Sequence, residues 1–220
     1  MIDLTELLKD PRLPGNYFAP NAYVQGDLEL GLLENRRGDR LLALPETLIE
    51  AIYLGLEQET GQAASLVLFN CGRWWGKNFY VHFCEEVSEY YNQPLSEMEM
   101  VEFTQCLKQC WKTYGWGLFD LDLTYAQAGF LLVKITHSLF AKKAPKGNRP
   151  VCFLEAGVFS AFYSQLTGRD LHCIQIACES QGAPCNQFLI GLSERLKPVE
   201  TYLEEGRAPE EILSQLTSAA

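Results

Sequence analysis

A change of hydrophobic rhythm half-way along the chain constrains the fold more than any other feature. Residues 118–123 alternate apolar and polar side chains, which is typical of a half-buried strand, and residues 130–137 supply a second strand after a short turn. Residues 171–177 and 186–192 form a second pair of this kind, and residues 151–166 between the pairs have a helical pattern. The second half therefore predicts two β-hairpins joined by a helix.

The first half of the chain has helical periodicity instead. Residues 45–60 place apolar side chains on one face, and residues 65–91 read as a long helix that contains Gly72 and Gly76. Interior glycines weaken a helix by about 1 kcal/mol each relative to alanine, so we expect a partner helix or a ligand to approach closely there. Ser96 and Glu99 suggest a capping box for a helix that runs to residue 114.

These elements together predict an α+β fold. We expect an antiparallel sheet of about four strands, made of the two hairpins and the helix between them, with several helices packed on one face. The stretch before residue 40 contains several prolines and glycines and is expected to form an irregular arm. A short helix is expected from Pro209 in the tail.

Composition narrows the class of protein. With 18 basic and 28 acidic residues the formal charge is −10, which argues against binding to a nucleic-acid backbone. The longest apolar run, residues 128–133, is far below the roughly 20 residues of a membrane span, and residues 1–6 lack signal-peptide features. Eight cysteines in such a chain are expected to be thiols or metal ligands, in a cytoplasmic protein.

Five short segments, in the same order along the chain, resemble the 4-vinyl-reductase domain family, which shares a ligand-binding fold with nitric-oxide-signalling and Golgi-transport proteins. The matching segments are residues 68–76, 114–117, 137–140, 150–157 and 178–188. The resemblance covers roughly residues 40–192. It therefore predicts an N-terminal arm at 1–39, a ligand-binding domain at 40–192 and a helical tail at 193–220.

The resemblance implies an apolar pocket for a planar ligand and a homodimer formed through the helices. Some members of the family are sensor domains of transcription activators, some belong to bacteriochlorophyll synthesis, and others are stand-alone cyanobacterial proteins linked to photosystem assembly. This chain has no recognisable DNA-binding or ATPase domain, and it is most similar to the stand-alone group.

Three cysteines are candidate metal ligands. Cys152 opens the helix between the hairpins, and Cys178 and Cys185 flank the turn of the second hairpin, so thiolates could meet around a structural zinc ion. The resemblance to the sensor branch implies a glutamate as a further ligand, but this chain has Gln175 there, a poor zinc ligand. Buried thiols, or a cross-hairpin Cys178–Cys185 pair, are the alternatives. Neighbours that could replace the glutamate are His172, Cys173 and Glu179.

Aromatic side chains are abundant, with 12 Phe, 10 Tyr and 4 Trp. They could line a pocket for a flat, mostly apolar ligand, or they could form an ordinary core. The candidate lining residues are Trp74, Trp111, Phe119, Phe130, Phe153, Phe159, Phe162 and Tyr163. His82 and His137 are candidate polar anchors, and His82 could also ligate the metal of a tetrapyrrole or serve only a structural role.

Three functions remain open at this stage. We favour non-catalytic binding of a hydrophobic planar molecule, such as a tetrapyrrole or another pigment, in chlorophyll handling or photosystem assembly, in the cytoplasm or at the periphery of a thylakoid membrane. A protein–protein assembly factor without a ligand is the second. An accessory subunit of a tetrapyrrole vinyl reductase is the third, although no catalytic motif is present and a reductase needs a cofactor as its hydride donor.

Overall fold

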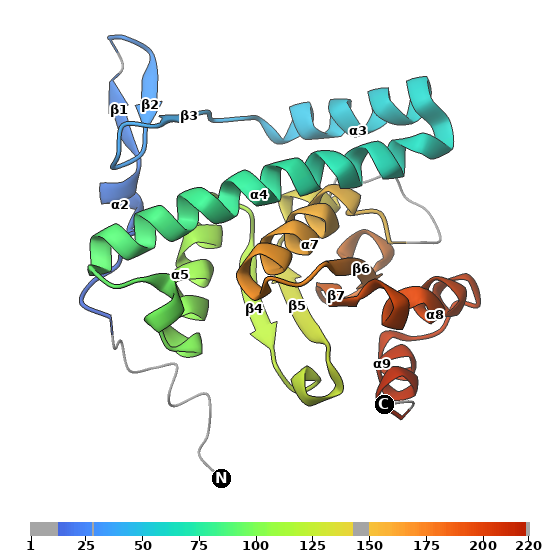
Figure 1. The fold of residues 1–220 in the computed structure, drawn as a ribbon. Coiled ribbons are helices and arrows are strands. Elements are labelled where there is room, and N and C mark those ends of the chain that lie inside the picture. Colours follow the sequence, from blue (N-terminus) through green and yellow to red (C-terminus); the bar gives the residue numbers. More distant parts are fainter. Residues whose placement is uncertain (1–12, 28, 143–149, 219–220) are drawn as a thin grey trace.

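The computed structural model describes residues 13–27, 29–142 and 150–218, and Figure 1 shows their arrangement. Four strands form the main sheet: β4 (Leu118–Asp122), β5 (Leu131–Thr136), β6 (Leu171–Ala177) and β7 (Asn186–Leu192). All pairings are antiparallel and the strand order is β4-β5-β7-β6, so β6 lies at an edge. The predicted α+β class and the two hairpins are confirmed.

Helix α7 (Phe153–Thr167) lies between the sheet and the long helix α4 (Ala64–Tyr91) (Figure 1). Glycines make this close packing possible. A Cβ atom added to Gly72 would overlap the carbonyl oxygen of Leu154, and one added to Gly157 would overlap the carbonyl oxygen of Phe69. The close helix approach predicted from the glycines of α4 is therefore confirmed, and its partner is α7.

Helix α5 (Met100–Thr113) packs against β4, and its start differs from the prediction. The residues around Ser96 form only a short 3₁₀ turn, Leu95–Glu97, and Glu99 is the N-cap of α5. The Glu99 N–H donates to the Glu102 side chain at 3.0 Å, so the capping box is one of two glutamates. Both carboxylates lie at the positive end of the helix dipole, which favours this start.

Helices cover the second face of the sheet as well, which corrects the expectation of helices on one face. α8 (Ser193–Glu204) and α9 (Pro209–Ser218) bury a separate apolar cluster that includes Leu132 and Leu189 of the sheet. The sequence did not indicate α8 because Pro198 lies inside it, and proline normally argues against a helix.

The N-terminal segment is also more regular than expected. It contains the helical turn α2 (Pro20–Tyr23) and a small antiparallel sheet of β1 (Gln25–Asp27), β2 (Leu32–Glu34) and β3 (Arg40–Leu41). Phe18 and Tyr23 are buried in the same apolar cluster as α5 and α7. The arm is therefore packed onto the rest of the fold.

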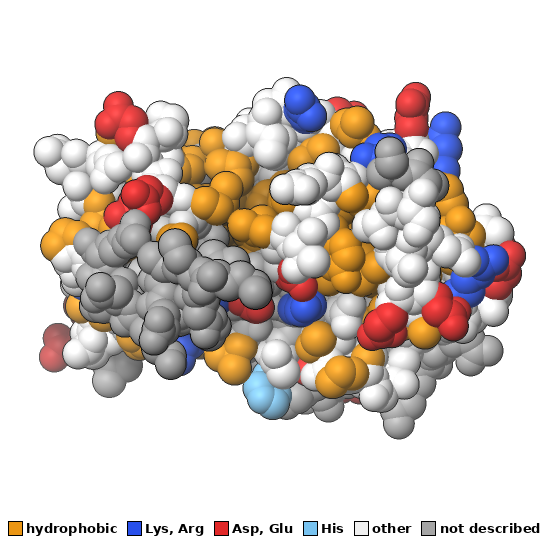
Figure 2. Space-filling model, turned by 90° about the horizontal axis from the view of Figure 1, so that it is seen from below, with side chains coloured by type: hydrophobic (Ala, Val, Ile, Leu, Met, Phe, Trp, Pro, Cys, Tyr) orange, Lys and Arg blue, Asp and Glu red, His pale blue; other side chains and the backbone are white. Residues whose placement is uncertain are grey.

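Helix α3 (Glu46–Thr60) lies antiparallel to α4, as the sequence predicted to within one residue (Figure 1). On the face seen in Figure 2, apolar side chains form patches with acidic and basic side chains between and around them. Within the described part of the chain, no helix has the length and hydropathy needed to cross a membrane.

Candidate ligand pocket

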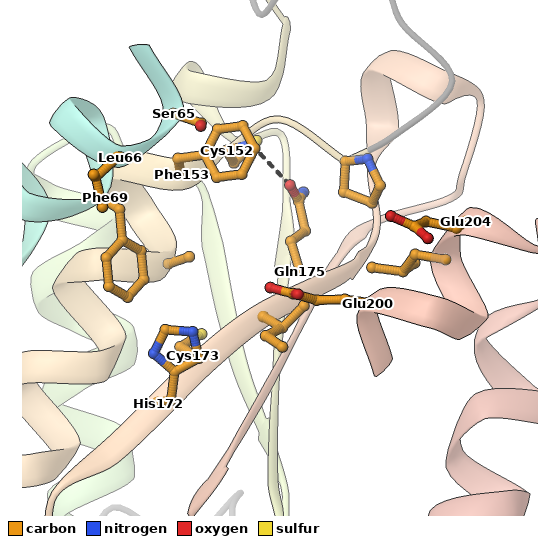
Figure 3. Close-up of a pocket in the computed structure, with 14 residues that line it drawn as sticks. Ser65, Leu66, Phe69, Cys152, Phe153, His172, Cys173, Gln175, Glu200 and Glu204 are labelled. Atoms are coloured by element: carbon orange, nitrogen blue, oxygen red, sulfur yellow. Dashed lines mark hydrogen bonds between the residues drawn. The ribbon is translucent and has the colours of Figure 1, made fainter. Parts of the chain in front are cut away.

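A cavity of about 370 Å³ lies beside the edge strand β6 (Figure 3). Four elements meet there: the first turns of α4, the first turns of α7, strand β6 and the last turns of α8. Its wall is mainly apolar, with a few polar groups. Side chains that line it include Leu66, Phe69, Phe153, Ala156, Ile174 and Leu203.

One wall of the pocket combines Phe69 of α4 with His172 of β6. Their ring centroids are 5.0 Å apart at an interplanar angle of 48°. Burial lowers the pKa of His172, so its imidazole is neutral at neutral pH and can donate or accept a hydrogen bond. Glu200 of α8 lies on the opposite side of the cavity (Figure 3).

Gln175 ties the start of α7 to the sheet. Its Oε1 accepts the backbone N–H of Cys152 at 2.8 Å, and its Nε2 donates to Asn186 Oδ1 at 3.1 Å. An amide can accept and donate at once, whereas an ionised carboxylate can only accept. The glutamine is therefore matched to both of its neighbours at the end of the pocket.

Cys152 and Cys178 lie side by side behind this end of the pocket. Their sulfur atoms are 3.9 Å apart, and the Cys178 sulfur is 3.0 Å from Ser180 Oγ. The hydrogen bond from Cys152, supported by Ser180, lowers the pKa of the Cys178 thiol to about 6. The same contact and burial raise the pKa of Cys152 well above its usual value.

A buried carboxyl group, Glu155, lies on the first turn of α7. Burial raises its pKa to about 8, although Ser138 Oγ donates to its Oε2 at 3.0 Å. Nearby, the Glu179 carboxylate accepts the backbone N–H groups of His137 and Ser138 at 2.8 and 3.1 Å, and the Asn186 side chain at 2.8 Å. Hydrogen bonds thus hold the ends of β5, β6 and β7 together beside the pocket.

The sequence model of the 4-vinyl-reductase domain matches residues 131–192, from β5 through α7 to β7. The chain is a 4-vinyl-reductase-domain protein. The family resemblance noted in the sequence is therefore confirmed. No curated protein matches the sequence.

One solved structure shares the fold of this 4-vinyl-reductase-domain protein over nearly its whole length. The phenol-responsive sensory domain of the transcription activator PoxR, solved with phenol, is 14% identical with a TM-score of 0.63, covering 93% of this chain and 97% of that one. Two further structures are less similar. A vinyl-4-reductase family protein from Methanocaldococcus jannaschii gives 0.45 at 14% identity, covering 68% of this chain and 82% of that one. Trafficking protein particle complex subunit 3 from Naegleria fowleri, covalently bound to palmitic acid, gives 0.48 at 10% identity, covering 68% and 97%.

The 4-vinyl-reductase domain brings together two of the three candidate zinc ligands. Within the described residues, no group of three His, Cys, Asp or Glu side chains is arranged to hold a metal ion, so Cys185 does not complete a set with Cys152 and Cys178. Cys185 is half-buried at the other end of the turn, and the Gln175 amide is occupied by its two hydrogen bonds. This arrangement does not fit a four-ligand zinc site.

Most of the predicted lining residues lie in the core of the domain. Trp111 packs on Phe159, with ring centroids 5.3 Å apart and nearly parallel, and on Phe119 at 5.5 Å. Phe162 and Tyr163 are buried in the same cluster, which we call the aromatic core. These rings fill the space between α4, α5, α7 and the sheet by contacting one another, and their role in ligand binding stays a prediction.

The other predicted site residues are spread over the molecule. Phe153 lines the pocket, whereas Phe130 is buried on the α8 side of the sheet. Trp74 is 72% exposed, and His82 and His137 are also exposed. The structure therefore does not bring these five residues to one site.

Sequence reasoning missed Phe69, His172 and Glu200 as pocket residues. Phe69 belongs to a segment that carried the family resemblance, but its place on the pocket side of α4 depends on how α4 crosses α7. Alternation along β6 assigned His172 and Cys173 to opposite faces, yet both line the pocket. An edge strand exposes one side of its backbone, so a cavity beside it can reach residues of both faces.

Proposed function

We propose that this 4-vinyl-reductase domain binds a small, planar and largely apolar molecule in the pocket beside β6. The observation that carries the proposal is the pocket itself, a cavity of about 370 Å³ with aromatic rings from two helices and few polar groups. Ligand sites in proteins are typically concave, mainly apolar and roughly 300–1,000 Å³ in volume. A pocket at the lower end of this range favours a compact ligand.

The polar groups of the pocket favour a ligand with one hydrogen-bonding substituent. A neutral His172 can pair with a hydroxyl or carbonyl group while Phe69 contacts the ring of the ligand. The likeness in fold to the phenol-responsive domain of PoxR supports the same class of ligand, a hydroxylated aromatic molecule of one or two rings.

A pigment is the finer form of this proposal, and it rests on the resemblance to the stand-alone members of the family. A tetrapyrrole would place one edge of its macrocycle in the pocket and leave the remainder outside. In this form the protein serves chlorophyll handling or photosystem assembly, as a homodimer or with pigment-pathway proteins, in the cytoplasm or at the thylakoid periphery.

Calorimetric titration of the purified full-length chain tests the proposal, with phenol, indole and a chlorophyll precursor as separate probes. We expect saturable binding of at least one probe, and a loss of at least about tenfold in affinity for Phe69→Ala, because the ring contact is lost. Trp74→Ala is the matched control, since it also removes an aromatic ring from α4 but at an exposed position. Absence of saturable binding by all three probes, or equal affinities for both variants, would contradict the proposal.

A protein–protein assembly factor is the second candidate. The observation that favours it is the aromatic core, where the rings expected to surround a ligand contact one another instead. Exposed apolar side chains on α3, such as Leu48 and Ile52, support a surface for a protein partner. Binding of a partner by a chain that takes up none of the three probes would favour this function.

A further inference from the structure

We propose that Cys152 and Cys178 form a reversible disulfide bond that joins the start of α7 to the end of β6. The part of this inference that concerns ligand affinity rests on the proposed function of the pocket, whereas the disulfide itself does not.

The positions of the two sulfur atoms support the bond. They are 3.9 Å apart in the reduced chain, so they must approach by roughly 2 Å to reach the bonded distance. Cys152 is the N-cap residue of α7 with non-helical backbone angles, and Cys178 directly follows the last residue of β6. Neither cysteine lies inside a regular element, so a small backbone adjustment at either end can close the gap.

The surroundings of the pair allow a small oxidant to reach it. Both side chains are almost fully buried, at 1% and 0% exposure, but Cys152 is also part of the pocket wall. A peroxide that enters the pocket therefore reaches the pair without unfolding of the chain. Ser180 Oγ, 3.0 Å from the Cys178 sulfur, can donate a hydrogen bond to the sulfur during attack.

The oxidation balances with hydrogen peroxide as the oxidant. The Cys178 sulfur attacks one peroxide oxygen, so that an S–O bond forms, the O–O bond breaks and the leaving hydroxide takes a proton to become water. The Cys152 sulfur then attacks the Cys178 sulfur, so that the S–S bond forms and the S–O bond breaks, and the Cys152 proton leaves with the hydroxide as a second water. The two thiols lose two electrons and the peroxide gains them.

The bond changes the wall of the pocket. The Cys152 side chain must turn toward Cys178, and its backbone N–H is the group held by Gln175 at the same end of the cavity. Oxidation therefore displaces a wall residue and strains the hydrogen bond that fixes the start of α7. We expect the oxidised chain to bind a pocket ligand with an affinity changed by at least about threefold.

Peptide mass spectrometry of the full-length chain tests the disulfide directly. The chain is treated with hydrogen peroxide, its remaining thiols are alkylated, and it is digested without reductant. We expect a cross-linked pair of peptides containing Cys152 and Cys178, 2 Da lighter than the sum of the free peptides, that separates after dithiothreitol. Cys178→Ser must abolish the cross-link, whereas Cys173→Ser, a buried neighbour on β6, must leave it intact.

Other outcomes would overturn the disulfide. These are alkylation of both cysteines after peroxide treatment that has oxidised the exposed Cys71, a Cys178–Cys185 link, irreversible oxidation of Cys178, or one zinc ion per purified chain bound to the pair. The oxidised wild-type chain should also unfold roughly 5–10 °C above the reduced chain, a shift that Cys178→Ser lacks.

Ligand titration of the oxidised and reduced chains is a separate readout. Equal affinities with the cross-link present would overturn the coupling to the pocket while leaving the disulfide in place. If no probe binds the reduced chain, the proposed function fails and the mass of the cross-linked peptides still decides the disulfide.

Discussion

The aromatic core and the pocket beside β6 use the same kinds of side chains with different results. In the aromatic core, Trp111, Phe119 and Phe159 contact one another and are almost fully buried. In the pocket, Phe69 and Phe153 are only partly buried, and a cavity of about 370 Å³ lies between helices and strand. The comparison teaches that aromatic content indicates burial, whereas a cavity depends on where packed layers diverge.

The divergence occurs at the edge of the sheet. The aromatic core lies over β4, β5 and β7, where α5 and α7 cover the sheet side by side. At β6, α7 packs from one face and α8 from the other, and the first turn of α4 completes the wall (Figure 3). Four elements that meet at an edge leave a gap that side chains do not fill.

The largest expected effect distinguishes the two regions by stability. Phe159→Ala removes a ring that is 1% exposed from the centre of the aromatic core, and we expect the free energy of unfolding to fall by about 3–5 kcal/mol. Urea denaturation measures the change. A loss below about 1 kcal/mol would mean that this region is not tightly packed, and the comparison would fail.

The seam between α4 and α7 gives the second effect. Gly157→Ala should destabilise the chain by about 3 kcal/mol, or prevent folding, because the new Cβ would overlap the carbonyl oxygen of Phe69. Gly55→Ala on α3 is the control, since no atom lies within 4 Å of its added Cβ. It should stabilise the chain by about 0.5–1 kcal/mol through helix propensity. Thermal unfolding of both variants checks the contrast, and similar effects would contradict it.

A buried acid near the pocket gives a pH-dependent effect. The pKa of Glu155 is raised from 4.5 to about 8 in the folded chain, so the folded state binds its proton more tightly than the unfolded state. Its contribution to stability is complete below pH 4.5 and is lost as the pH rises toward 8, by about 1.4 kcal/mol per pH unit. Glu155→Gln should remove this slope.

Denaturation at several pH values measures the slope in the wild type and in Glu155→Gln. A second buried acid, Glu86, has its pKa raised by burial to about 7 and accepts hydrogen bonds from Tyr23 and Asn35. Its slope should therefore persist up to about pH 7 in the variant. A variant with the full wild-type slope between pH 7 and 8 would show that Glu155 is ionised in the fold.

The smallest effect on stability should come from the pocket. Phe153→Ala removes a partly buried ring, so the free energy of unfolding should fall by about 1 kcal/mol, while affinity for a bound probe falls at least about tenfold. Phe159→Ala shows the opposite balance, a large loss of stability. Calorimetry with urea denaturation checks both, and a stability loss for Phe153→Ala as large as that for Phe159→Ala would erase the distinction.

Local patterns predicted the elements that depend on local chemistry. Alternation identified all four strands of the main sheet, and the glycines of α4 indicated a close helix contact. The small N-terminal sheet was missed because its strands are two or three residues long and carry little hydrophobic pattern. Helix α8 was missed because Pro198 lies within it.

The location of the pocket could not be read from local patterns. The strand order places β7 between β5 and β6, which leaves β6 at the edge, and the turn residues do not encode that order. The aromatic side chains were identified correctly as apolar, but their distribution between the core and the cavity depends on helix crossing. His172 of β6 faces a cavity whose opposite wall, at Glu200, comes from a helix beyond the next strand.

The most direct test of the central claim is a two-dimensional ¹H–¹⁵N NMR titration of the full-length chain with phenol. Binding beside β6 predicts that the amide signals of residues 172–175 and of Phe69 and Phe153 shift with ligand concentration, while the indole N–H signal of Trp111 stays in place. Shifts concentrated at Trp111 and Phe119, with the β6 signals unchanged, would place the ligand in the aromatic core and contradict the account.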